Sequence, residues 1–288
     1  MHLAVLKKEI IEHLNLQPND NFIDCTAGEG GHLFSLLEKT QPDGLALGID
    51  KDKRNVELIK EKANQRVIVR EDNYLNLEKI AKEENLKNIS AILFDLGFSS
   101  WHIDESGRGF SFQKEELLDM RYSLKDETMA WEIINSWPPE EIEIIIKELG
   151  EDRFARKITK AIILRRKEKK ITTAKELAEL IVKEVPRTKK IHPATKTFQA
   201  LRLVVNRELE NLEKALPLAL KILKKEGRLS VISYHSLEDR IVKRFFKQMN
   251  QEKKVEILNK KPIIPGQGEI KNNPRARSAK LRTIIKKE

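Results

Sequence analysis

Four short apolar runs, each followed by an amphipathic segment, constrain the fold of this 288-residue chain most strongly. The runs are NFIDCT, GLALGID, RVIVR and ISAILFD, at residues 21–26, 44–50, 66–70 and 89–95. Helical patterns lie between them, near residues 31–40, 52–64 and 74–86, which is the order of half a doubly wound parallel sheet. Because ligands of such sheets bind at the carboxyl ends of the strands, the residues that follow these runs should gather along one edge.

The first run leads into a turn that contains Gly28, Gly30 and Gly31. Glycines in such a turn let a ligand approach the backbone where a Cβ would clash. The dinucleotide fingerprint G-x-G-x-x-G fails, because Leu33 occupies the place of its last glycine, and no Gly-Lys-Ser/Thr follows to make a phosphate-binding loop. The remaining pattern, D-x-T-x-G-x-G from Asp24, resembles the first motif of S-adenosylmethionine-dependent methyltransferases. The alternative is an ordinary α/β turn.

Side chains at the other strand ends have suitable chemistry for such a cofactor. Asp50 ends the second run, where a carboxylate can accept hydrogen bonds from both ribose hydroxyls. Tyr74 is expected to pack on the adenine, or else to be a core aromatic at a helix start. Asp95 ends the fourth run beside the expected sulfonium, with a helix cap as its alternative role. Cys25 is the only cysteine, so disulfides and cysteine-based zinc sites are excluded, and no metal is expected.

After residue 102 the strand rhythm stops, and residues 103–200 show helical patterns without a convincing strand. The fold class expected is therefore α/β, a Rossmann-like sheet domain formed by residues 1–102 and 201–288 and interrupted by an all-helical lobe. A long helical pattern over residues 194–224 contains Pro217, which predicts a kink or break at that proline. Near the C-terminus, GRLSVIS resumes the sheet, and VEILN with AKLRTIIKK predicts a closing hairpin.

The charge balance favours a polyanionic partner. Lys and Arg total 55 against 45 acidic residues, a formal charge of +10, and such a surplus binds phosphates with release of counterions. Many proteins are simply basic, so the charge alone does not decide the partner. No apolar run approaches the ~18 residues of a membrane span, and the chain starts with an amphipathic pattern unlike an export signal. We therefore expect a cytoplasmic protein without a membrane partner.

Six further blocks carry a resemblance that covers almost the whole chain. They are DLGFSS, GRGFSF, LDMR, KIHPATKTFQALRLVVN, VISYHSLEDRIVKRFF and NPRARSAKLR. Together and in this order they resemble the bacterial 16S ribosomal RNA cytosine-N4 methyltransferase family. The resemblance implies a class I methyltransferase sheet with a helical lobe for substrate recognition. It also implies methylation of a cytosine amine in the decoding region of 16S ribosomal RNA or of the small subunit, with S-adenosylmethionine as donor.

The resemblance also assigns residues to the cofactor. Carried over position by position, the contacts fall on Gly30, Gly31, His32, Asp50, Tyr74, Asp95 and His102. Two positions depart from the family pattern, which often has Phe in place of Tyr74 and Pro-Gln in place of Trp101-His102. A histidine at the second position keeps a hydrogen-bond donor but brings sensitivity to pH.

Catalysis on an exocyclic amine calls for a hydrogen-bond acceptor aimed at the amine protons. Amino-directed methyltransferases commonly present Asp/Asn/Ser-Pro-Pro-aromatic at this strand end, and Asp95-Leu96-Gly97-Phe98 matches its first and fourth positions only. The expected catalytic residues are Asp95 and His235, the latter in a positioning role or as a general base. Ser236 and Glu238 are expected as helix-start residues, and the alternative for this segment is a purely structural role.

Basic side chains within the family blocks are the candidates for RNA contact. They are Arg108, Arg202, Arg275, Arg277 and Lys280. In GRGFSF the alternative is an arginine that caps its own loop, with Phe110 and Phe112 in the core. In LDMR, Asp119 and Arg121 form either a mutual ion pair or substrate contacts.

Three other functions compete with this hypothesis. One is a small-molecule methyltransferase on the same sheet, and another is an RNA-binding ribosome assembly factor with a vestigial pocket. The third is an NAD-linked oxidoreductase, which Leu33 in the glycine turn disfavours. The sequence leaves the oligomeric state open, a homodimer included.

Overall fold

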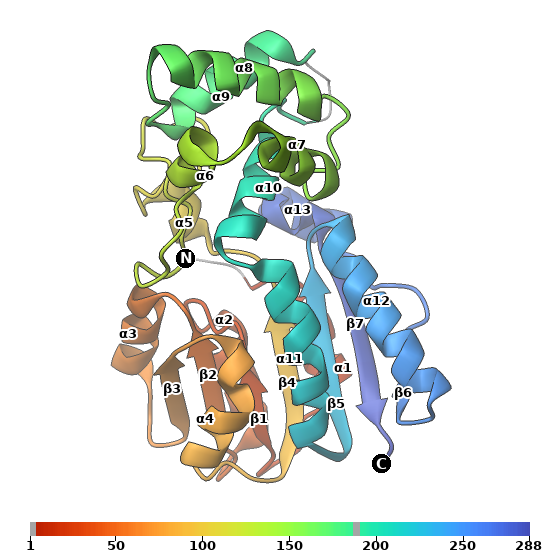
Figure 1. Cartoon of the computed structure of the whole chain (residues 1–288). Coiled ribbons are helices and arrows are strands. Elements are labelled where there is room, and N and C mark those ends of the chain that lie inside the picture. Colours follow the sequence, from red (N-terminus) through yellow and green to blue (C-terminus); the bar gives the residue numbers. More distant parts are fainter. Residues whose placement is uncertain (1–3, 187–190) are drawn as a thin grey trace. The chain divides into compact units, whose positions relative to one another are not determined.

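The computed structural model describes residues 4–186 and 191–288 (Figure 1), and its contacts divide the chain into two compact units. The sheet unit comprises Met1–Phe98 and Leu209–Glu288, and the inserted unit comprises Ser99–Glu208. The inserted unit extends beyond residues 103–200 because Leu201 and Val205 pack in its own core and the ring of His102 lies against Phe110 of that core. The role of this unit in substrate recognition stays a prediction.

The described residues of the sheet unit form a seven-stranded sheet in the order β3-β2-β1-β4-β5-β7-β6. Its strands are β1 (Asn21–Asp24), β2 (Ala46–Asp50), β3 (Val67–Glu71), β4 (Ile89–Asp95), β5 (Leu223–Ser233), β6 (Val255–Ile257) and β7 (Lys280–Lys286). Strands β1 to β5 are parallel, and β7 runs antiparallel between β5 and β6. The strand order reverses between β1 and β4, which is where a doubly wound sheet binds its ligand. The expected α/β class is confirmed.

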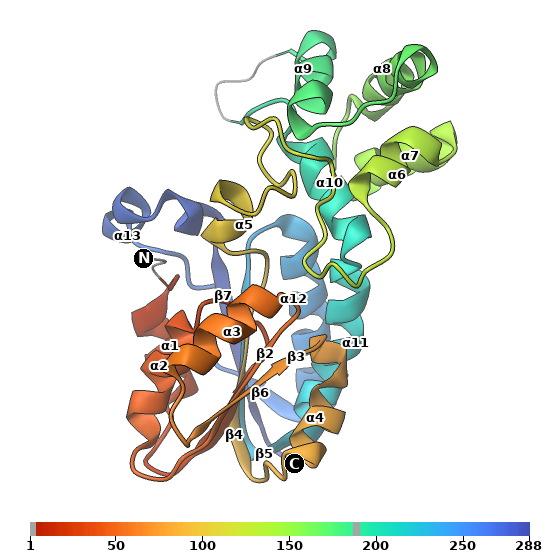
Figure 2. The ribbon, with the colours of Figure 1, turned by 90° about the vertical axis from the view of Figure 1, so that its left-hand side faces the viewer.

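Helices cover both faces of this sheet, as Figure 2 shows. They are α1 (Lys7–Leu14), α2 (Gly31–Leu37), α3 (Lys53–Lys62), α4 (Leu77–Glu83), α11 (Glu208–Ile222), α12 (Ser236–Gln251) and α13 (Gln267–Asn272), with short 3-10 turns at Glu38–Thr40, Tyr74–Asn76 and Pro274–Ser278. Successive strand residues point to opposite faces. Phe22 accordingly packs with Leu33 and Ile59 under α2 and α3, whereas Ile23 packs with Leu216 under α11.

Among its described residues, the inserted unit consists of helices and loops, the longest loop spanning residues 105–129, and its β pairing is limited to the isolated bridge between Leu117 and Thr173. Its helices are α5 (Ser100–Asp104), α6 (Ala130–Ser136), α7 (Pro139–Glu148), α8 (Ala155–Glu168), α9 (Ala174–Glu184) and α10 (Thr195–Val205). They enclose a separate core of fully buried side chains that includes Ile133, Ile158 and Leu177. The lobe therefore has its own hydrophobic centre, as a compact unit requires.

The predicted break at Pro217 was wrong. Helix α11 continues through Pro217, and the interruption lies between α10 and α11 at Asn206 and Arg207, where Arg207 has φ 51°. The proline removes one helical hydrogen bond, but burial of its neighbours Leu216 and Leu220 keeps α11 on the sheet. The predicted closing pair is confirmed, since β6 and β7 are antiparallel, although the connection between them contains α13.

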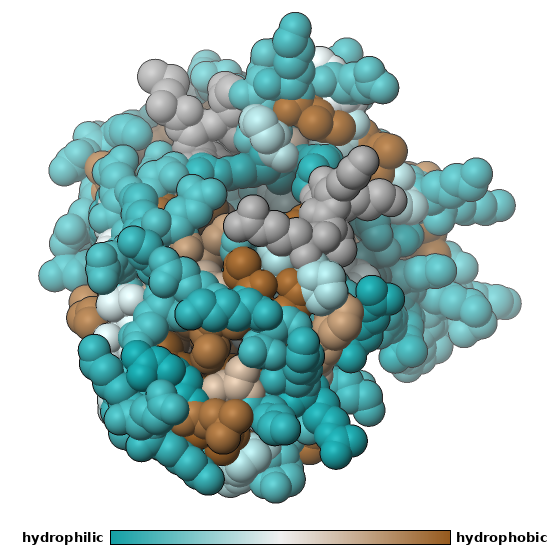
Figure 3. All heavy atoms as spheres, turned by 90° about the horizontal axis from the view of Figure 1, so that it is seen from above, coloured by the Kyte–Doolittle hydropathy of each residue, from teal (hydrophilic) through white to brown (hydrophobic). Residues whose placement is uncertain are grey.

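The surface is strongly polar. Hydrophilic side chains cover most of the face in Figure 3, with hydrophobic ones in small patches between them, as expected for a chain with 35% charged residues. Across residues 4–186 and 191–288, no helix combines the length and the apolar character needed to cross a bilayer.

Candidate functional site

The turn between β1 and α2 leaves its backbone bare at the switch point of the sheet. Gly30 has φ +86°, and a Cβ at this position would lie 2.5 Å from Cε2 of Phe34. Both the backbone angle and the space therefore demand glycine. Gly31 follows as the first residue of α2, with the Cβ of Ala4 only 3.2 Å from where its own would be. The side chains of Phe34 and Ala4 therefore pack directly against this turn.

Asp50, at the end of β2, ties the glycine turn to the neighbouring strand. Its Oδ2 accepts a hydrogen bond from the Gly28 N–H at 2.7 Å. Its Oδ1 accepts from the Asp52 N–H at 2.8 Å and from Nδ2 of Asn55 at 3.3 Å. These bonds fix the orientation of the carboxylate at the end of β2. The predicted bonds to ribose hydroxyls fit this geometry and stay a prediction.

Asp95 ends β4, and its carboxylate lies between Tyr234, directly after β5, and His32 in α2. Oδ1 accepts a hydrogen bond from the hydroxyl of Tyr234 at 2.7 Å, and Oδ2 lies 3.5 Å from Nε2 of His32. The backbone N–H of Asp95 donates to Oγ1 of Thr26 at 2.6 Å. The side chain is only 17% exposed. Tyr234 was not among the predicted site residues, although its position directly after β5, the neighbour of β4, was a signal for it.

A buried acid and a buried histidine lie behind Asp95. Asp24 and His32 are 1% and 5% exposed. Burial raises the pKa of Asp24 to about 7, against the lowering effect of His32, and the charges of Asp95 and Asp50 raise it further. Burial lowers the pKa of His32, but the contact with Asp95 and the charges of Asp95 and Asp24 outweigh it, so the net shift is upward. Among the described residues, neither ring nitrogen of His32 has a hydrogen-bond partner.

The acidic strand ends suit a ligand that carries positive charge and a diol. Three carboxylates, Asp24, Asp50 and Asp95, end the strands β1, β2 and β4. Burial disfavours the charged form of an acid, and a positive ligand beside it would stabilise that form. The sulfonium and ammonium groups of S-adenosylmethionine supply such charge. The three carboxylates at the strand ends therefore fit this cofactor.

Tyr74 lies in the turn after β3 with a partly buried ring. The ring meets Phe94 edge-on, with centroids 5.4 Å apart, and packs on the main core of the sheet unit. This is the core role given above as its alternative. Packing on an adenine face stays a prediction.

His102 belongs to the inserted unit and is 4% exposed. Its ring lies edge-on to those of Trp101, Phe110 and Tyr122, with centroids 5.0 to 5.3 Å apart. Its Nδ1 lies 3.0 Å from Oγ of Ser99. This aromatic cluster fixes the ring within its own unit, and contact with the cofactor stays a prediction.

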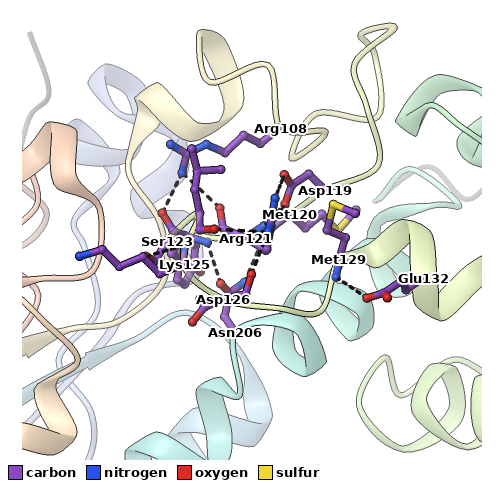
Figure 4. Close-up of polar contacts among 12 residues, drawn as sticks. Arg108, Asp119, Met120, Arg121, Ser123, Lys125, Asp126, Met129, Glu132 and Asn206 are labelled. Carbon is purple, nitrogen blue, oxygen red and sulfur yellow. Dashed lines mark hydrogen bonds and ion pairs between the residues drawn. The ribbon is translucent and has the colours of Figure 1, made fainter.

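Arg108 closes a loop of the inserted unit, drawn in Figure 4. Its guanidinium donates to the carbonyl oxygens of Arg121 and Tyr122, at 3.3 and 2.7 Å, and lies 5.2 Å from the centre of the Trp101 ring. Phe110 is buried in the core of the unit. These contacts match the loop-capping alternative, and the RNA contact of Arg108 stays a prediction.

The LDMR segment in the same loop is held by its own side chains. Asp119 and Arg121 form a two-pronged ion pair, at 2.7 and 2.9 Å. Met120 between them has φ +64°, and its carbonyl accepts from Nδ2 of Asn206 at 2.8 Å. Asn206 also accepts from the Tyr122 N–H at 2.8 Å. The loop is thereby fixed to the end of α10, as Figure 4 shows.

The other basic candidates differ in what surrounds them. Arg202 forms a two-pronged ion pair with Glu208, at 2.8 and 3.0 Å, and is only 12% exposed. Arg275 and Arg277 are exposed on the turn before β7. Lys280 lies 3.5 Å from Asp239. Exposure makes Arg275 and Arg277 the more accessible of the predicted RNA contacts.

His235 caps the helix that follows β5. Its Nδ1 accepts from the Glu238 N–H at 3.4 Å, and its Nε2 lies 3.1 Å from a carboxylate oxygen of Glu238. The same carboxylate accepts from the backbone N–H of Tyr234 at 2.8 Å. Ser236 begins α12 and Glu238 lies in its first turn, as expected, and the contacts of His235 give it a structural role as the cap. A catalytic role for His235 stays a prediction.

The strand order, the glycine turn after β1 and the acidic ends of β2 and β4 define a class I S-adenosylmethionine-dependent methyltransferase. S-adenosylmethionine is the methyl donor of this class. The chain belongs to the MraW methylase family, whose model matches residues 1–287.

Curated relatives match the chain from end to end. It is 44% identical over 287 residues to the ribosomal RNA small subunit methyltransferase H of Sulfurihydrogenibium sp., covering 98% of this chain and 97% of the relative. The protein of the same name from Dictyoglomus thermophilum is 45% identical over 292 residues, covering 100% and 97%. The crystal structure of a proposed rRNA methylase from Clostridium thermocellum shares the fold, with a TM-score of 0.50, 14% identity and coverage of 99% and 100%.

Proposed function

We propose that this chain transfers a methyl group from S-adenosylmethionine to the exocyclic N4 amine of a cytosine in the decoding region of 16S ribosomal RNA. The observation that carries the proposal is Asp95, a hydrogen-bond acceptor held at the end of β4, where amino-directed methyltransferases present theirs. The name of the relatives, ribosomal RNA small subunit methyltransferase H, supports the substrate.

Different residues of the sheet unit bind the cofactor and act on the target amine. When bound, S-adenosylmethionine supplies an electrophilic methyl group on a sulfonium. The turn at Gly30 and Gly31 admits the donor, and Asp50 accepts hydrogen bonds from its ribose. Asp24 lies among the charges that stabilise the positive ligand. Asp95 accepts a hydrogen bond from the target amine, which favours a pyramidal nitrogen and stabilises the charge that develops there. No metal is needed for any of these roles.

Recognition of the RNA rests on charge and on the inserted unit. A net charge of +10 favours the phosphate backbone, and the exposed Arg275 and Arg277 are the leading contacts. The target cytosine must leave its stack to present its amine. We assign recognition of the surrounding nucleotides to the inserted unit.

The experiment uses the full chain with S-adenosylmethionine labelled in its methyl group, and either naked 16S ribosomal RNA or intact small subunits. The nucleosides are then separated by chromatography and identified by mass spectrometry, and fragments from ribonuclease digestion locate the label. The expected product is labelled N4-methylcytidine in a decoding-region fragment. Label on a carbon atom, label on free metabolites only, or cofactor binding without transfer would each contradict the proposal.

The ribose role of Asp50 is tested by calorimetry. Asp50→Ala should weaken binding of S-adenosylmethionine by about tenfold or more, because bonds to a charged acceptor contribute about 1.5–3 kcal/mol. Asp43→Ala, at an exposed position of the same unit, is the matched control. Equal affinity of the two variants would contradict the role.

A further inference from the structure

The bond between Tyr234 and Asp95 crosses from one strand end to the next. Asp95 is the last residue of β4 and pairs in register with Ile232, two residues before Tyr234. The tyrosine hydroxyl donates to Oδ1 of Asp95 at 2.7 Å. Burial, and then the charge of Asp95, raise the pKa of Tyr234 well above its ordinary value. The hydroxyl therefore keeps its proton and stays a donor.

Tyr234 is itself held at both ends. Its backbone N–H donates to Oε2 of Glu238 at 2.8 Å, and the same oxygen accepts from the His235 N–H at 3.3 Å. The ring lies against Gly97, where a Cβ would be 3.7 Å from Cδ2 of the tyrosine and where φ is +102°. The cap of α12 thus fixes the backbone of Tyr234, and the turn after β4 fixes its ring.

The other oxygen of the Asp95 carboxylate faces α2. His32, behind the glycine turn, lies 3.5 Å from Oδ2, and Thr26 accepts the backbone N–H of Asp95 at 2.6 Å. The terminal torsion of an aspartate is otherwise broad. The hydroxyl of Tyr234 therefore holds one oxygen of the carboxylate, with His32 3.5 Å from the other.

We propose that Tyr234 is a positioning residue for methyl transfer, which holds the Asp95 carboxylate so that an acceptor lone pair faces the target amine. This inference rests on the proposed function. In the step itself, the amine lone pair forms the new C–N bond and the C–S bond breaks with its electron pair staying on sulfur. The amine then releases one proton to solvent. An acceptor displaced by about 1 Å loses much of its effect on such a step.

The first experiment compares steady-state kinetics of Tyr234→Phe with the wild type. The variant should lose about 10- to 100-fold in kcat, as expected for a hydrogen bond to a charged group. The KM and the calorimetric Kd for S-adenosylmethionine should stay nearly the same. Titration with the cofactor counts folded sites, so kcat is expressed per folded molecule. Unchanged kcat, or an equal loss in cofactor affinity and kcat, would overturn the inference.

A double-mutant cycle separates positioning from general damage. If Tyr234 acts through Asp95, Tyr234→Phe should have no further effect on kcat in an Asp95→Asn background. Additive losses would refute the inference. Thr283→Val is the matched control, since it removes a buried hydroxyl bond to Ser230 between β5 and β7 and should leave kcat unchanged. If the wild type itself makes no N4-methylcytidine, the proposed function fails; if it does and the cycle is additive, only the role of Tyr234 fails.

Discussion

Replacing Asp24 by asparagine should remove a large pH dependence of stability. The Asp24 carboxyl has a pKa of about 7 in the folded chain against an ordinary value of 3.8, chiefly because it is buried. Between these values the folded chain retains a proton that the unfolded chain has released. Stability is therefore lost as the pH rises from about 4 to about 7.

The size of the effect follows from the width of that window. Each pH unit amounts to about 1.4 kcal/mol, so about three units amount to about 4 kcal/mol. Asparagine has no proton to release and retains an oxygen for the Thr26 N–H, which lies 3.2 Å from Oδ1 in the wild type. From pH 4 to pH 8, the free energy of unfolding of Asp24→Asn should gain about 4 kcal/mol relative to the wild type. Loss of the Asp24 charge also lowers the pKa of His32, because that charge raises it in the wild type.

The measurement is urea denaturation followed by far-UV circular dichroism at several pH values. Fluorescence is unsuitable, since the three tryptophans, Trp101, Trp131 and Trp137, all lie in the inserted unit. Asp43→Asn makes the same chemical change at an exposed position of the sheet unit and serves as control. Parallel stability curves for Asp24→Asn and wild type would refute the reasoning.

Two further variants probe the glycine turn and the inserted unit. Gly30→Ala should lower affinity for S-adenosylmethionine at least about tenfold, because its Cβ would lie 2.5 Å from Phe34 at a φ of +86°. The control is Gly268→Ala, since Gly268 has open space around it. Equal affinities of the two variants in calorimetry would contradict this prediction. Asn206→Ala leaves the N–H of Tyr122 without its acceptor at a buried site and should cost about 2–4 kcal/mol. Tryptophan fluorescence during denaturation measures that loss, and a cost within experimental error would count against it.

The strand ends were predictable because their signals are local. The runs that end at Asp50 and Asp95 became strands that end at those acids, and the run over residues 21–26 became a strand that ends at Asp24. The glycine turn was equally predictable from the sequence, because the backbone angle and the crowding at Gly30 depend on nearby residues such as Phe34. Periodicity and turn chemistry act over a few residues, and a single sequence displays them directly.

The features that escaped prediction depend on distant residues. Tyr234 meets Asp95 across 139 positions of sequence, and only the strand order brings them together. The interruption at Asn206 depends on a loop 84 to 86 positions earlier, whose backbone it binds. Pro217 carried the stronger local signal for a break, but packing of α11 on the sheet overrode it.

The insertion between β4 and β5 has a consequence for synthesis. These strands pair directly in the sheet, although the whole inserted unit lies between them in the chain. A ribosome synthesises the N-terminal part first. The edge of β4 therefore stays unpaired while more than a hundred further residues are synthesised before β5. The lobe has its own core and needs no such wait. The bond that orients Asp95 is thus among the last to form, and a nascent chain acquires its acceptor geometry only near the end of translation.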